Sequence, residues 1–111
     1  MLNIIYETSA SKNFNSFLKE SSSFLYKNNL ISDKKIFINK IIERENLGST
    51  LITLDTKLPH INSDCVLINS IIVYNLLYNF DNLKTIIILI TNNQITYKAK
   101  KEIAQFLEKF I

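Results

Sequence analysis

Four residue types that are rare in this chain lie together in one short segment. The sequence contains one histidine, one proline, one glycine and one arginine. All four lie between residues 44 and 60, as Arg44, Gly48, Pro59 and His60. Histidine titrates near neutral pH, so its neutral imidazole is available as a nucleophile. His60 is therefore the best candidate for the centre of any chemistry in this chain.

The residues around His60 suit the acceptance of a phosphoryl group. A phosphorylated imidazole brings negative charge that fixed donors must meet. The guanidinium of Arg44 offers a planar fork that matches phosphate oxygens, and the hydroxyls of Ser49 and Thr50 are further candidate ligands. Pro59 holds the residue before it in an extended conformation and stiffens the approach to the histidine.

A simpler interpretation of the same residues stays open. A lone histidine in a small domain is commonly a surface residue or a hydrogen-bonded polar group. Arg44 could pair with an acidic neighbour on its own helix, and Ser49 and Thr50 could simply begin a strand. Lys57 could be plain surface charge.

Hydrophobic spacing predicts the elements that position this segment. Ser9 or Ser11 is expected to cap a first helix, Ser32 a second, and Gly48 to end the second helix. An α/β or α+β sandwich with a central sheet follows, in one domain spanning residues 1–111. The predicted elements are an apolar start near residues 2–5, helices at about 12–28, 32–45 and 98–110, and strands at 51–54 and 85–91. One long strand or two are expected within residues 66–77.

Composition narrows the class of protein. The chain has 111 residues, a net charge of +3 and 47% apolar residues, which fits one small domain with a proper core. Its lysines are mostly scattered, and the cluster from Lys98 to Lys101 resembles a solvated helix face, so no nucleic-acid binding is expected. Cys65 is a single cysteine, which excludes an internal disulfide and disfavours a zinc site. Without a long apolar run or a signal-like start, the expected location is the cytoplasm.

The motif resembles a known family. Arg44-Glu45, then Gly48-Ser49-Thr50, then Pro59-His60 is similar to the IIA domain of the fructose–mannitol class of the bacterial phosphoenolpyruvate-dependent sugar phosphotransferase system. The resemblance covers nearly the whole chain. It implies that family's phosphotransferase/anion-transport-protein-like fold, an α/β fold with a central mixed sheet flanked by helices. It implies that His60 accepts phosphate from the histidine phosphocarrier protein and passes it to a cysteine of a IIB domain. Arg44 would clamp the phosphate beside Ser49 and Thr50. No cofactor is expected, and any link to the membrane would be indirect, through a IIC permease.

Two departures from the family pattern keep three functions open. The stretch from Leu51 to Leu58 lacks glycine and carries Lys57 where a small side chain is usual. The family's second, supporting histidine is absent, and Thr96-Tyr97-Lys98 occupies that region. Lys57 is therefore also a candidate phosphate ligand, as a substitute cation. The chain could be a working carrier, a IIA-like regulatory domain of a sugar-operon transcriptional regulator or antiterminator that senses phosphorylation, or a catalytically dead interaction domain.

Overall fold

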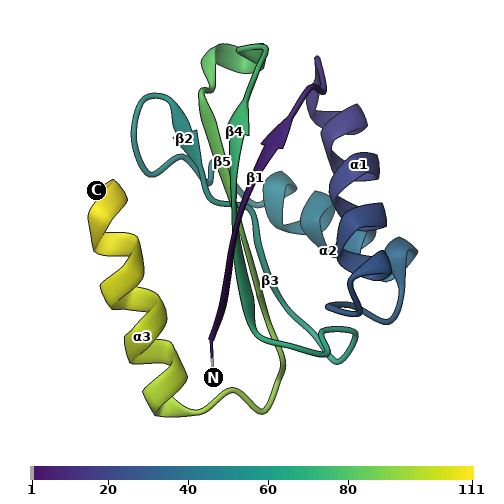
Figure 1. Cartoon of the computed structure of the whole chain (residues 1–111), viewed down its shortest axis with the longest axis vertical. Helices are drawn as coiled ribbons and strands as arrows, with labels where there is room; N and C mark the ends of the chain where they lie inside the picture. The colour runs from purple at the N-terminus through teal and green to yellow at the C-terminus, as the bar shows by residue number, and fades with distance from the viewer. Residues whose placement is uncertain (1) are drawn as a thin grey trace.

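Two helices cover one face of a five-stranded sheet, and a third helix covers the other face (Figure 1). The computed structural model describes residues 2–111. Within this range, none of the helices has both the length and the apolar character that a membrane span requires. The elements in chain order are β1 (Asn3–Ser9), α1 (Phe14–Lys27), α2 (Lys34–Asn46), β2 (Thr56–Lys57), β3 (His60–Asn62), β4 (Ser70–Leu76), η1 (Phe80–Asn82), β5 (Thr85–Thr91), α3 (Tyr97–Leu107) and η2 (Glu108–Phe110).

Strand β5 lies between β4 on one side and the short strands β2 and β3 on the other. β4 runs antiparallel to β5, whereas β2 and β3 run parallel to it. β1 pairs in parallel with β4 and forms the opposite edge. The predicted α/β fold with a central mixed sheet is confirmed, and the register places His60, the first residue of β3, opposite Leu89 of β5.

The core is divided by the sheet into two apolar clusters. The near-continuous apolar sequence of β5 forms the predicted strand, with Ile86, Ile87 and Ile88 fully buried between the helix layers. On one face, α1 and α2 contribute Phe17, Leu25, Phe37 and Ile41 among others. On the other face, α3 contributes Ile103 and Phe106, which pack with Ile71, Val73 and Ile87.

The residues that cap the first two helices lie further along the chain than predicted. Asn13 caps α1, where its side chain accepts from the Ser16 N–H at 2.8 Å, and Asp33 caps α2 in the same way. The prediction of Ser9 or Ser11, and of Ser32, as caps is wrong. The hydroxyls of Ser9 and Ser11 both donate to the carboxylate of Glu20 in α1, so they do not cap the helix. Asparagine and aspartate next to the helix start are the better-placed acceptors.

The strand predicted at residues 51–54 does not form. Leu51 makes only an isolated bridge, and Leu54 is 95% exposed. The hydroxyl of Thr53 donates to the carboxylate of Asp55 and accepts from the Asp55 N–H, so this segment turns back on itself. Such local side-chain bonds compete with a strand ladder. The pairing with β5 begins only after this turn, in β2.

One buried polar atom in the larger cluster gives a stability prediction. Tyr74 is 1% exposed, and its hydroxyl has no hydrogen-bond partner within residues 2–111. Burial, reinforced by nearby Glu20 and Glu7, raises the pKa of Tyr74, so the hydroxyl stays protonated. A Tyr74→Phe variant should gain about 1 kcal/mol in free energy of unfolding, because phenylalanine lacks the buried hydroxyl that has no hydrogen-bond partner.

Urea unfolding measures this change, with Tyr78→Phe as the control because Tyr78 is half exposed. Loss of stability in Tyr74→Phe beyond that of the control would mean that the hydroxyl makes a stabilising hydrogen bond in solution.

Candidate functional site

The last turn of α2 supplies two consecutive side chains to the site, Arg44 and Glu45. The backbone N–H groups of Leu47 and Gly48 donate to the carbonyl oxygens of these two residues, at 3.1 and 3.4 Å, and close the helix. Gly48 then adopts φ = +148°, a conformation that residues with side chains rarely adopt. The prediction that Gly48 ends the helix is confirmed, and both side chains lie where the chain turns toward β2.

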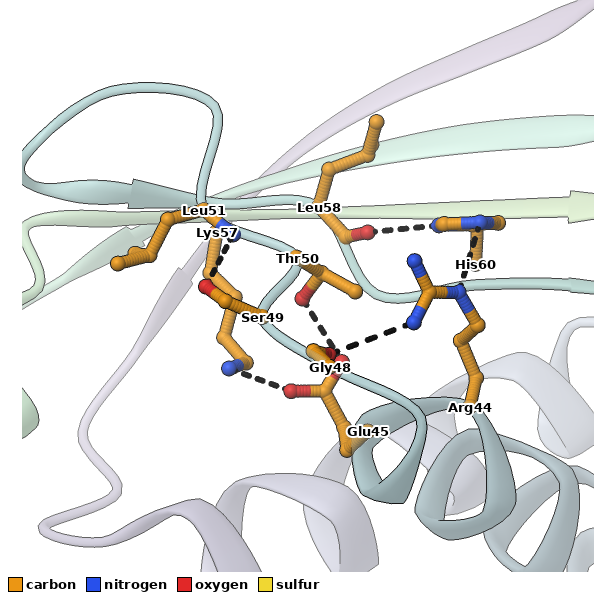
Figure 2. A network of polar contacts seen from close by, with 9 residues as sticks. All are labelled: Arg44, Glu45, Gly48, Ser49, Thr50, Leu51, Lys57, Leu58 and His60. Carbon is orange, nitrogen blue, oxygen red and sulfur yellow. Dashed lines mark hydrogen bonds and ion pairs between the residues drawn. The ribbon is translucent and has the colours of Figure 1, made fainter.

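Strand β3 brings His60 to the end of α2. The N–H of Leu89 in β5 donates to the carbonyl of Pro59 at 3.1 Å, so the strand is held to the sheet immediately before the histidine. Pro59 is buried, whereas His60 and Arg44 are each partly exposed. A residue from the helix end and a residue from the sheet edge, 16 positions apart, therefore meet side by side (Figure 2).

The hydrogen bonds of His60 assign the proton on its ring. Nδ1 lies 2.9 Å from the carbonyl oxygen of Leu58. A carbonyl oxygen only accepts, so Nδ1 carries the hydrogen and Nε2 carries the lone pair. Nε2 in turn accepts from the Nε–H of Arg44 at 3.3 Å. The nucleophilic nitrogen of the neutral ring thus faces the guanidinium, as Figure 2 shows.

Arg44 is braced by the loop that follows its own helix. One terminal amino group donates to the carbonyl of Gly48 at 3.3 Å. A guanidinium has five N–H groups, so most of them stay available to another acceptor. Beside Arg44 and His60 is an open hollow of about 260 Å³, large enough for a phosphoryl group. Its lining residues are Lys40, Glu43, Arg44, Leu47, His60, Ile61 and Asn62.

The three other predicted ligands are not among the residues that line this hollow, and each has a partner within the protein. The Ser49 hydroxyl accepts from the Leu51 N–H at 3.1 Å. The Thr50 hydroxyl donates to Glu45 at 2.7 Å, and the ammonium of Lys57 pairs with the same carboxylate. A direct contact of Ser49, Thr50 or Lys57 with phosphate stays a prediction.

Sequence reasoning missed three contributors to the site. Glu45 was part of the recognised motif but had no role assigned to it. Lys40 lines the hollow, and its position four residues before Arg44 on a helix is a signal that it shares the same face. The backbone carbonyl of Leu58 leaves no signal in the sequence, because any residue type provides one.

The region of the absent second histidine lies at the start of α3. Thr96 caps this helix by accepting from the Ala99 N–H at 3.1 Å, and Tyr97 is 77% exposed. Within the described part of the chain, neither side chain has a hydrogen bond to His60. Nor do residues 2–111 bring three His, Cys, Asp or Glu side chains together in a way that could hold a metal ion.

Comparisons with known proteins place the chain in a family. A structural match is the crystal structure of the nitrogen regulatory protein IIA-Ntr from Neisseria meningitidis, with a TM-score of 0.68 and 18% identity. It covers 96% of this chain and 77% of that one. No curated protein matches the sequence significantly. The family model of the phosphoenolpyruvate-dependent sugar phosphotransferase system, EIIA 2, matches residues 3–110. The chain therefore belongs to the EIIA type 2 family of the phosphoenolpyruvate-dependent sugar phosphotransferase system.

Proposed function

We propose that this domain is a cytoplasmic phosphoryl carrier in which Nε2 of His60 accepts a phosphoryl group from the histidine phosphocarrier protein. One observation carries the proposal: the Leu58 carbonyl takes the proton of Nδ1, while the lone pair of Nε2 points at Arg44. An imidazole held in this tautomer has one reactive nitrogen, already next to a cation that suits phosphate oxygens.

The transfer step balances without a cofactor. The lone pair of His60 Nε2 forms a bond to phosphorus, and the nitrogen–phosphorus bond of the donor phosphohistidine breaks and returns its electron pair to the donor ring. Nδ1 keeps its hydrogen and continues to donate to Leu58. The Arg44 N–H that Nε2 accepted is then free for a phosphoryl oxygen, where the guanidinium offsets the added charge.

In the second half of the proposed cycle, the phosphoryl group passes from His60 to a sulfur atom. A cysteine thiolate of a IIB domain attacks the phosphorus, and the bond to Nε2 breaks, which restores the neutral ring. We place this relay in a sugar-uptake system of the fructose–mannitol class, with a IIC permease as the membrane component. Support comes from membership of the EIIA type 2 family and from the partly exposed position of His60.

A regulatory domain whose phosphorylated state is read by a partner is the second candidate. The observation that favours it is that His60 is the single histidine, so no second imidazole is available to support release of the phosphoryl group. Discharge by a IIB domain separates the two functions: prompt loss of phosphate to the cysteine identifies the carrier, and persistence identifies the regulator.

The test uses the full chain with phosphoenolpyruvate, enzyme I and the histidine phosphocarrier protein. We expect one phosphate per chain, labile in acid and stable in base, as for a phosphoramidate. Nitrogen-15 NMR of the His60 ring should place the phosphorus on Nε2. An acid-stable phosphate, a group on Nδ1 or no incorporation at all would contradict the proposed site.

A further inference from the structure

A second polar network lies behind His60 and uses residues that the proposed transfer does not touch. Glu45 accepts from the Thr50 hydroxyl through one carboxylate oxygen, at 2.7 Å, and its other oxygen pairs with Lys57 (Figure 2). The side chains of Lys57 and Glu45 are only 19% and 16% exposed. Solvent screens such a pair less than a surface pair, so the carboxylate is held firmly in place.

This network reaches the imidazole through one stretch of backbone. Thr50 is 5% exposed and is fixed at its side chain by Glu45. Its carbonyl accepts from the Leu58 N–H at 2.9 Å, and the Leu58 carbonyl accepts from His60 Nδ1 at 2.9 Å. The position of the carbonyl that selects the His60 tautomer therefore depends on where Thr50 lies.

Lys57 adds a second tie to the same backbone. It lies in β2, directly before Leu58, and its pairing with Glu45 joins that strand to the end of α2. Leu58 is thus held in two ways: by the hydrogen bond of its N–H to Thr50, and by the ion pair that its neighbour Lys57 makes with Glu45. The exposed pair of Lys84 and Asp55, 3.9 Å apart with side chains 68% and 45% exposed, has no such link to the histidine.

We propose that Glu45, held by Thr50 and Lys57, is a positioning residue that keeps His60 in the tautomer protonated on Nδ1. The adjacent residue, Arg44, contacts Nε2, so one helix end controls both nitrogens of the ring. The inference rests on the proposed function for its consequence, because Nε2 must hold its lone pair to accept phosphate. It does not rest on that function for its geometry.

The experiment reads the tautomer directly, by nitrogen-15 NMR of His60 in the full chain at alkaline pH. In the native chain we expect the ring to be almost wholly protonated on Nδ1. In Glu45→Ala the tautomer protonated on Nε2 should rise by about tenfold, the effect of losing one charge-assisted hydrogen bond. Glu45→Gln, which keeps an oxygen for Thr50 but loses the ion pair with Lys57, should give a ratio between those of the native chain and Glu45→Ala. Lys84→Met is the matched control and should leave the ratio unchanged.

Thr50→Val provides a second variant of native shape should Glu45→Ala fail to fold, and it should shift the ratio in the same direction. An unchanged ratio in both folded variants would overturn the inference. A shifted ratio in a chain that never accepts phosphate would uphold the positioning role and refute the proposed function. Phosphorylation of the native chain, with no shift of the tautomer ratio in the variants, would support the proposed function and refute the positioning role.

Discussion

A His60→Ala variant should accept no phosphate from the histidine phosphocarrier protein. His60 is the single histidine of the chain, so no second imidazole can form a phosphoramidate in its place. Phosphate placed instead on a nearby hydroxyl, such as that of Ser49 or Thr50, would be an acid-stable ester and is therefore distinguished from the acid-labile phosphoramidate. Radiolabel transfer from phosphoenolpyruvate, with enzyme I and the phosphocarrier present, measures the result.

The fold should tolerate this change, because His60 is partly exposed and pairs with β5 through its backbone. Equal unfolding midpoints for the native chain and His60→Ala would show that lost acceptance reflects lost chemistry. Acid-labile label retained by the folded variant would place the acceptor elsewhere and remove His60 from the centre of the site.

Arg44→Lys should slow phosphorylation of His60 by about ten- to a hundredfold, the cost of one charge-assisted hydrogen bond expressed in the transition state. Lysine keeps the charge but loses the fork that lets Arg44 donate to His60 Nε2 and to Gly48 at the same time. Rapid-quench measurement of label transfer gives the rate, and circular dichroism confirms the fold.

Lys40→Gln is the control for charge alone, because Lys40 lines the same hollow. Its effect should be smaller than that of Arg44→Lys, since a flexible ammonium on an exposed side chain is a weaker and less directed ligand. If Lys40→Gln were the slower of the two, the charge of the hollow and not the geometry of Arg44 would govern transfer.

Much of the fold could be predicted from the sequence because α1 and α3 have amphipathic patterns and β5 is a continuous apolar run. The isoleucines of β5 are buried on both faces, and an uninterrupted apolar run is the sequence pattern of such a strand. β2 and β3 contain two and three residues, too few for any periodicity to appear. Leu51, Ile52 and Leu54 look like a strand, but Thr53 and Asp55 form a local turn that the apolar pattern does not reveal.

The candidate site divides in a similar way. The motif predicts that Arg44 and His60 belong to one site, and their side chains lie in contact. Their roles toward phosphate stay predictions. The engagement of Lys57 by Glu45 depends on how a loop folds back over the helix end, and spacing along the chain carries no information about that. The backbone carbonyl of Leu58, which fixes the ring proton, is invisible to any analysis of side-chain types.

The parallel pairing of β1 with β4 has a consequence for the order of folding. Residues 3–9 find their partners at residues 70–76, so the first strand waits until most of the chain is available. Both helices of the first layer and the segment from Arg44 to His60 lie within the loop that this pairing closes. Contacts of such long sequence separation form late and make folding slow. His60 lies in β3, which pairs with residues 89–91 of β5, so a chain that ends before β5 lacks the pairing that holds the imidazole beside Arg44.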